Sequence, residues 1–170
     1  MSSTAAAPLV QLGLEPDGCV PEPHNSEYGA FLTRVGEAVV RIRSGKVTPT
    51  KLGAFVAVWQ RNADGGTEPF ASEDGVHVLA VSLTDKDNSG VFLFPTAALA
   101  AHDIVSVGNT GGKRGFRVYP PWAQVTSGQA QRTQRWQGEY FFDLSAGDLG
   151  ERVRARAVGF VQEAIRAVSS

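Results

Sequence analysis

The chain has 170 residues and a formal net charge of −1, and hydrophobic residues make up 42% of it. These values are ordinary for one globular domain and exclude a disordered or fibrous protein. The single cysteine, Cys19, cannot form an internal disulfide, and together with the three histidines it gives no pair at zinc-ligand spacing. We expect a single domain over residues 8–170, a loose tail over residues 1–7, and neither metal nor cofactor.

The first ten residues lack the basic segment and the apolar stretch of a signal peptide. No apolar run reaches the length needed to cross a bilayer. We therefore expect a cytoplasmic protein without a membrane partner.

The N-terminal part of the chain predicts one helix after two less regular segments. Residues 8–14 fit either a short helix or a strand, and the proline-rich residues 21–24 are typical of a linker. Asn25 or Ser26 can cap a helix, and apolar residues at helical spacing extend it to about Val35.

The next predicted element is a strand over residues 40–43. Val40 and Ile42 alternate with Arg41 and Arg43, so the apolar side chains share one face and the arginines share the other. This alternation is typical of a strand that is buried on one face only.

The rest of the chain predicts strands and helices joined by polar turns. The strands cover residues 55–60, 76–83, 91–94, 104–107 and 116–119, and the first of them is apolar on both faces. The helices cover residues 96–101, the first half of 127–140, and 150–168, where one apolar stripe is clearest. The expected fold is α/β (α+β), a single domain with a mixed central sheet flanked by helices.

Charge is strongly segregated along the chain, although the net charge is near zero. Two basic blocks, residues 34–61 and 104–138, contain a single acid between them, Glu37, and the segment between the two blocks is acidic. If both blocks fold onto one face, they make a surface that attracts phosphate. Its cations are Arg41, Arg43, Lys46, Lys51, Arg61, Lys113, Arg114 and Arg117.

Aromatic residues accompany these cations, and Trp122 and Trp136 are the candidates for stacking on bases. Stacking combined with phosphate attraction is suited to single strands. The sequence therefore predicts a non-catalytic nucleic-acid-binding protein that favours single-stranded nucleic acid or RNA without base specificity.

Two alternatives remain open from the residues alone. The first is a degenerate metal-dependent nuclease that uses Glu27, Asp74 and Lys51. Metal-dependent nucleases add an acid-x-lysine on the strand that follows such an aspartate, but residues 91–94 hold neither an acid nor a lysine. The second is a module for a small anion or nucleotide, held by Thr48, Lys51 and a glycine-rich loop, Gly111-Gly112-Lys113.

Several composite strings resemble the MepB family of small bacterial proteins, and the match covers nearly the whole chain. The strings are Glu27-Tyr28, Lys46-x-Thr48-Pro49-Thr50-Lys51-x-Gly53-x-Phe55-Val56, Trp59-x-Arg61-Asn62, Pro69-Phe70, Phe92-x-Phe94-Pro95, Gly112-Lys113-Arg114-Gly115-Phe116-Arg117-Val118-Tyr119-Pro120-Pro121-Trp122 and Gln134-x-Trp136-Gln137 before Tyr140-Phe141.

The resemblance implies a restriction-endonuclease-like α/β fold, PD-(D/E)XK-like, whose catalytic Asp…(Asp/Glu)-x-Lys set has been lost. It also implies nucleic-acid binding and an association with drug-response operons. On this basis no catalytic residue is expected, and Asp74 and Glu27 are the candidate remnants of the catalytic set.

Overall fold

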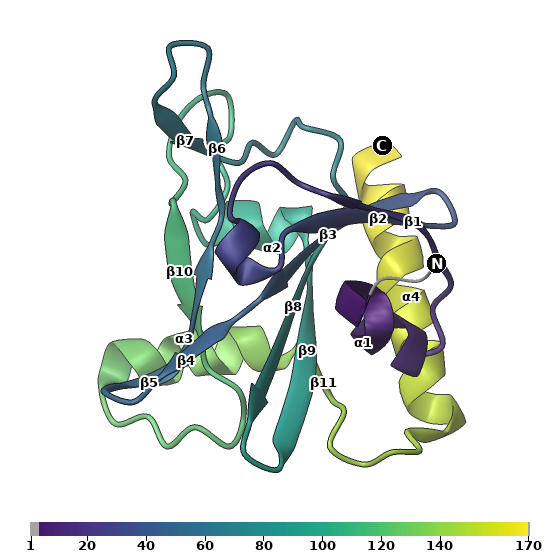
Figure 1. Ribbon diagram of the computed structural model, residues 1–170. Coiled ribbons are helices and arrows are strands. Elements are labelled where there is room, and N and C mark those ends of the chain that lie inside the picture. The colour runs from purple at the N-terminus through teal and green to yellow at the C-terminus, as the bar shows by residue number, and fades with distance from the viewer. Residues whose placement is uncertain (1–3, 170) are drawn as a thin grey trace.

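A six-stranded mixed sheet runs through the middle of the computed structural model, which describes residues 4–169 (Figure 1). Its strands are, in spatial order, β1 (Pro16–Pro21), β2 (Phe31–Val35), β3 (Ala38–Ser44), β8 (Val78–Asp85), β9 (Asn88–Pro95) and β11 (Phe141–Asp143). β3 and β8 are parallel, and the other neighbouring pairs are antiparallel. The sheet is therefore mixed, as the sequence predicts.

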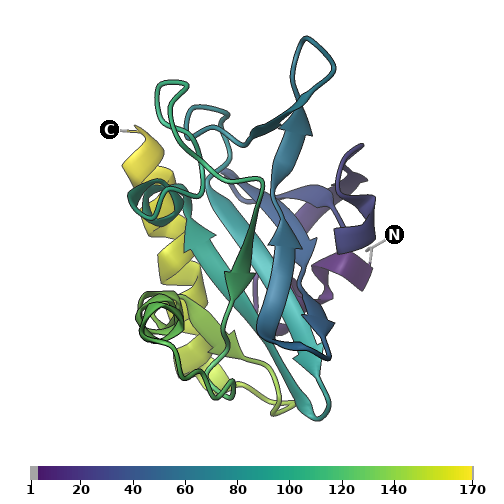
Figure 2. The same ribbon diagram turned by 90° about the vertical axis from the view of Figure 1, so that its left-hand side faces the viewer.

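A smaller sheet forms a second layer beside the large one. It consists of β10 (Gly115–Val118), β5 (Lys51–Ala57) and β4 (Lys46–Thr48), all antiparallel. The hairpin of β6 (Trp59–Arg61) and β7 (Thr67–Pro69) continues beyond β5. Figure 2 shows β5 and β10 in front of the large sheet.

The helices of the described residues complete the two layers. They are α1 (Ala7–Gln11), α2 (Thr96–Ala101), α3 (Gly128–Gly138) and α4 (Gly150–Ser169), with 3-10 turns η1 (Thr4–Ala6) and η2 (Ser26–Tyr28). One hydrophobic core joins α1 and α4 to one face of the large sheet. A second core fills the space between the other face and the small sheet, and includes residues of α2. None of these helices is long and apolar enough to span a membrane.

The predicted helix after residue 25 is wrong. Asn25 and Gly29 both have positive φ, which limits helix to the single turn η2, and the following residues form β2. Gly36, at φ 59°, then turns the chain back into β3. Thr33 and Val35 are β-branched and favour a strand, so apolar spacing alone was ambiguous here.

The structure confirms most of the other predicted helices and strands and corrects two predicted segments. The strands at β3, β5, β8, β9 and β10 and the helices α2, α3 and α4 are confirmed, and Ser127 caps α3 by accepting the Ala130 N–H. The strand predicted over residues 104–107 contributes only isolated bridges. Residues 4–7, expected in the loose tail, form η1 and the start of α1, and residues 1–3 lie outside the described range.

Candidate nucleic-acid interface

The two basic blocks lie side by side, because β10 of the second block pairs with β5 of the first. In this register Arg117 is opposite Phe55, and Gly115 is opposite Ala57. On the other edge of β5, Lys46 of β4 is also opposite Phe55. Since opposite residues in antiparallel strands point to the same side, Lys46, Phe55 and Arg117 form one row across the small sheet.

This row lies on the outer face of the small sheet, away from the core. The neighbouring positions Ala54, Val56 and Val118 point inward and are fully buried, whereas Phe55 is half-buried. Tyr28 from η2 contacts Phe55 edge to face, with ring centroids 6.0 Å apart. The Lys46 Nζ lies 4.6 Å from the centroid of the Tyr28 ring and 3.3 Å from a carboxylate oxygen of Glu27.

A second aromatic group continues the same face from the neighbouring strand β6. Trp59 stacks with His24 at a centroid distance of 5.7 Å, and the Arg61 guanidinium carbon lies 5.2 Å from the Trp59 ring. A cavity of about 370 Å³ is lined by both Trp59 and Tyr28. We call this surface the aromatic face and define it by Tyr28, Lys46, Phe55, Trp59, Arg61 and Arg117.

Two glycines allow the aromatic rings to lie flat on this sheet. A Cβ on Gly115 would collide with the Phe55 ring, so that ring lies across the glycine. Gly53 has φ +75°, and a Cβ there would collide with the Val118 carbonyl and the Tyr119 ring. Both glycines belong to the basic strings of the sequence. Close packing explains why these two positions hold glycine.

Arg41 and Arg43 are not on this surface, and the prediction of an exposed arginine face on β3 is wrong. β3 is an interior strand with both faces covered, and the relative exposures are 8% for Arg41 and 0% for Arg43. The Glu22 carboxylate accepts hydrogen bonds from both arginines. Its Oε1 lies 3.2 Å from Arg41 Nε and 2.6 Å from Arg43 Nη1. Burial lowers the pKa of Arg43, and the Glu22 carboxylate opposes that effect.

The same buried network includes Asp74, the candidate catalytic remnant. Its carboxylate accepts from Arg41 Nη1 at 3.1 Å and from the Val76 N–H at 3.1 Å. The Arg41 guanidinium stacks over Phe70 at 3.5 Å. The other acid of the nuclease alternative, Glu27, is elsewhere and pairs with Lys46. Residues 4–169 contain no group of three or more acidic, histidine or cysteine side chains that could hold a metal ion.

Two glycine amides of the loop before β10 donate to carboxylates. The Gly112 N–H donates to Asp103, the Gly108 N–H donates to Glu73, and each N···O distance is 2.9 Å. The Gly108 hydrogen bond lowers the pKa of Glu73. Within Gly111-Gly112-Lys113, the Gly112 N–H binds a carboxylate and the Lys113 N–H donates to the Ile104 carbonyl, which leaves fewer amides for a phosphate.

Lys113 and Arg114 follow this loop in different roles. Lys113 is exposed and lines a cavity of about 370 Å³ between β10 and α3. Arg114 is held by Thr67 of β7, with Nε 2.8 Å from the hydroxyl and Nη2 2.7 Å from the carbonyl oxygen. Lys113 is therefore a free cation at the rim, and Arg114 ties β10 to the β6–β7 hairpin.

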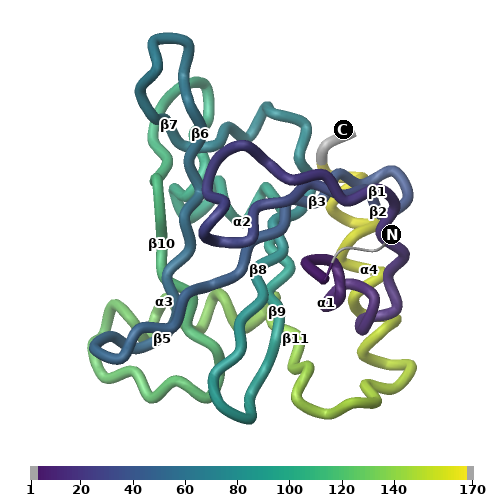
Figure 3. Tube along the Cα trace, in the orientation of Figure 1, coloured from purple at the N-terminus to yellow at the C-terminus, as the bar shows by residue number. Residues whose placement is uncertain are grey.

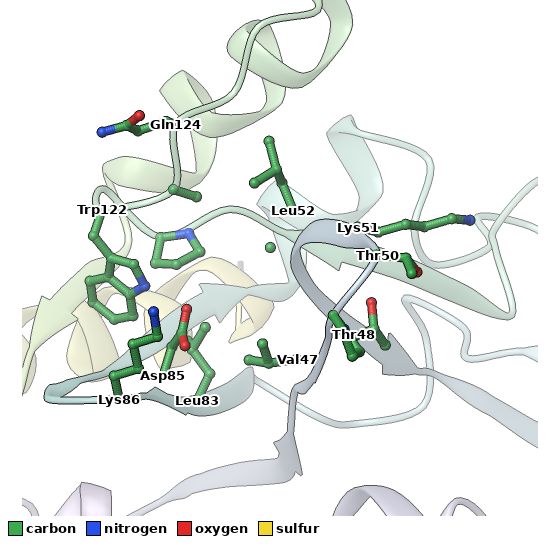
Figure 4. Close-up of a pocket in the computed structure, with 14 residues that line it drawn as sticks. Val47, Thr48, Thr50, Lys51, Leu52, Leu83, Asp85, Lys86, Trp122 and Gln124 are labelled. Atoms are coloured by element: carbon green, nitrogen blue, oxygen red, sulfur yellow. The ribbon is translucent and has the colours of Figure 1, made fainter.

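Lys51 and Trp122 line a third cavity, which is formed by segments that are distant in the sequence. Figure 3 shows the path of the chain through the turn before β5, which is one of these segments. Residues 47–53 and 120–124 line it together with Leu83, Asp85 and Lys86, and its volume is about 580 Å³. Trp122 touches Phe141 edge to face, with centroids 5.6 Å apart. Figure 4 shows the Trp122 ring and the side chains of Asp85 and Lys86 on one side of this space.

Trp136 is less available for a base than the sequence suggests. It packs against the second core, where its ring lies 5.5 Å from Phe94. His102 stacks on it at 3.8 Å with an interplanar angle of 7°. Tyr28, Phe55 and Trp59 are partly exposed rings that the sequence analysis does not single out as candidates for stacking.

A signal for these three aromatics was present in the sequence. Phe55 and Trp59 are four positions apart in a run that predicts a strand, so they share a face. Lys46 and Arg61 flank that run. The run was interpreted as a central strand because both of its faces are apolar. The half-burial of the outer face depends on the layer order, which the local pattern does not contain.

Comparison with known proteins assigns the chain to a family. A family model described as MepB-like matches residues 22–143, well over half of the chain. The chain belongs to the MepB-like family. A solved structure similar to it is the crystal structure of MepB, with 30% sequence identity, a TM-score of 0.75, and coverage of 86% of this chain and 99% of that one. No curated protein matches the sequence.

The string Gln134-x-Trp136-Gln137, one of those that resemble the MepB family, has a clear structural role in this chain. Gln137 of α3 is fully buried; it donates to the Arg117 carbonyl at 2.9 Å and accepts from the Tyr119 N–H at 2.8 Å. Gln134 donates to the carbonyls of Pro120 and Ala123. Gln137 takes the place of a neighbouring strand at the edge of β10. Gln134 fixes the loop that carries Trp122.

Proposed function

We propose that the chain is a non-catalytic nucleic-acid-binding protein that holds single-stranded nucleic acid or RNA on the aromatic face. The observation that carries this proposal is the row Lys46–Phe55–Arg117 across three strands of an outer sheet face. It combines a ring for stacking with cations on both sides for phosphates, which is the arrangement that single-strand binding requires.

The second aromatic group supports the same proposal. Trp59, with Arg61 beside it and His24 stacked on it, gives a further ring on the same side of the chain. Stacking contributes about 1–3 kcal/mol per base and tolerates any base. Duplex bases are already stacked inside the helix, so we expect a preference for single strands.

We also propose that the core is a restriction-endonuclease-like frame whose catalytic set has been lost. Asp74 lies four positions before the first residue of β8, and β8 forms an antiparallel hairpin with β9, which leads into α2. The ion pair of Asp74 with Arg41 supports a loss of metal binding, because a cation already occupies one side of the carboxylate. A role in a drug or stress response rests on the family resemblance alone.

The test is fluorescence anisotropy with short labelled single-stranded RNA, single-stranded DNA and duplex DNA. We expect tighter binding of the single strands, and we expect the double variant Lys46→Glu/Arg117→Glu to weaken it about tenfold or more at low salt. The matched control is Arg152→Glu/Arg166→Glu on α4, at the opposite layer of the molecule, which should bind as the wild type does. Equal losses in both double variants would contradict the placement.

A further inference from the structure

The cavity of about 580 Å³ lies where the space between the two sheets is left open. Its walls come from the β4–β5 turn, the end of the β8–β9 hairpin and the loop after β10. Val47 is opposite Ala54, which belongs to the buried core, so Val47 points to the inner side of the small sheet. The cavity is thus an extension of the inter-sheet core that reaches the surface.

Apolar side chains at this opening remain unusually exposed. Leu52 is 51% exposed and Val47 is 43% exposed, and both line the cavity with Leu83 and Trp122. The edge contact with Phe141 fixes the Trp122 ring, and Gln134 of α3 fixes its loop by donating to the carbonyls of Pro120 and Ala123. The opening therefore presents a positioned aromatic ring and aliphatic groups, which favour a flat, partly apolar ligand.

Three charged side chains surround this apolar opening. Asp85, Lys86 and Lys51 line the cavity, and Figure 4 shows the Asp85 carboxylate next to Trp122 and Lys86. Within residues 4–169, no hydrogen bond or ion pair holds the Asp85 side chain. Asp85 is on the same side of β8 as Leu83, two residues earlier, so its carboxylate borders the inter-sheet space.

We propose that this cavity receives one unstacked base of the bound strand, and that it prefers guanine. The inference rests on the proposed function and adds a base preference to it. The base stacks on Trp122, its N–H groups donate to Asp85, and Lys51 and Lys86 attract the adjoining phosphates. The cavity is large enough for one base with its sugar, and a strand on the aromatic face reaches it across β5.

The chemistry of the carboxylate selects among the bases. An ionised aspartate only accepts hydrogen bonds, and it can accept two in parallel. Guanine presents N1–H and the 2-amino group side by side, which matches both oxygens. Adenine and cytosine offer an amino group next to a ring acceptor, and uracil offers one N–H between two carbonyl oxygens, which repel the carboxylate.

The position of the cavity also fits a strand that crosses the aromatic face. Lys51 and Phe55 are the start and the middle of the same strand, β5, and four residues of strand span roughly 13 Å. A few nucleotides cover this distance. The base that leaves the stack on Phe55 can therefore enter the cavity beyond the β4–β5 turn.

The experiment measures binding of a labelled eight-nucleotide oligouridine and of the same oligomer with one central guanosine, adenosine or cytidine. We expect the single guanosine to tighten wild-type binding about fivefold or more, the range of one good base contact. Asp85→Asn should bind the guanosine oligomer no better than oligouridine. Asp87→Asn, in the same hairpin turn but outside the cavity lining, should keep the preference.

The outcomes separate this inference from the proposed function. If wild type binds all four oligomers equally, or if Asp85→Asn keeps the guanosine preference, the base pocket is wrong and the aromatic face stands. If wild type binds none of the oligomers at low salt, both proposals are overturned. Guanosine monophosphate, with uridine monophosphate as control, gives a second readout: it should quench wild-type tryptophan fluorescence, and the quenching should be reduced in Trp122→Phe.

Discussion

At the scale of single residues, burial decides what each arginine does. Arg43 lies on an interior strand, is fully buried, and is held by Glu22, Asn25 and two carbonyl groups. Arg117 lies on an outer sheet face, and within residues 4–169 its side chain makes one hydrogen bond, to the Leu52 carbonyl. Some cations of the two basic blocks therefore stabilise the fold, and others lie on a surface that can attract phosphate.

Removing the acid of the buried network should strongly destabilise the fold. Glu22→Ala leaves two buried guanidinium groups without their shared carboxylate, and the loss of one partner of a buried ion pair costs about 3–5 kcal/mol. Glu27→Ala removes an exposed partner of Lys46 and should cost less than about 1 kcal/mol. Urea unfolding of both variants measures the difference, and equal free energies of unfolding would contradict the role of Glu22.

The pairing of Asp74 with Arg41 predicts that the chain has no nuclease activity. Labelled single-stranded RNA or DNA should stay intact with magnesium or manganese, because Asp74 is paired with Arg41 and β9 brings no second acid. Gel analysis after long incubation checks this expectation. Cleavage that disappears in Asp74→Ala would support the degenerate nuclease instead.

The sequence indicated these residues only in part. The alternation around Arg41 and Arg43 predicted their common face correctly, but the partners that bury it, Glu22 and Asp74, lie 19 to 33 residues away from Arg41 in the chain. Glu22 stands between two prolines, a pattern typical of a linker. Long-range ion pairs have no local signature, so the buried network could not be read from the sequence.

At the scale of elements, α3 completes the small sheet from its open edge. Gln137 occupies the place of a strand neighbour by bonding both the N–H of Tyr119 and the carbonyl of Arg117. The helix therefore fixes the strand that carries Arg117 and the loop that carries Trp122. The aromatic face and the cavity lined by Trp122 therefore both depend on α3.

Loss of this contact should loosen β10. Gln137→Leu leaves a buried donor and a buried acceptor unpaired, which costs about 1–3 kcal/mol for each group. Hydrogen exchange at the Tyr119 amide should become faster, and the unfolding midpoint should fall. Gln129→Leu, at an exposed position in the first turn of α3, is the control and should change neither quantity. Unchanged exchange at Tyr119 in Gln137→Leu would contradict the edge role.

Element prediction succeeded where local patterns were strong and failed where tertiary pairing decides. α4 was visible from its apolar stripe, and the β8–β9 turn from its Asp, Asn and Gly residues. β1, β7 and β11 were missed because such short strands need a partner strand to exist. The same dependence on pairing turned the predicted helix after residue 25 into η2 and β2.

At the scale of the whole molecule, the net charge of −1 conceals an uneven distribution. The β5–β10 pairing brings the two basic blocks together, which the sequence could suggest but not establish. Burial then removes Arg41 and Arg43 from the surface, and leaves Lys46, Arg61 and Arg117 beside aromatic rings. The expected interface is therefore smaller than the sequence implied, and richer in rings.

The salt dependence of single-stranded RNA binding tests the central claim most directly. With about three phosphate contacts on the aromatic face, the logarithm of the association constant should fall with the logarithm of salt concentration at a slope of about −2. The slope should become shallower in Lys46→Glu/Arg117→Glu and stay unchanged in Arg152→Glu/Arg166→Glu. Absence of binding at low salt, or a slope that the first variant leaves unchanged, would contradict the aromatic face as the binding surface.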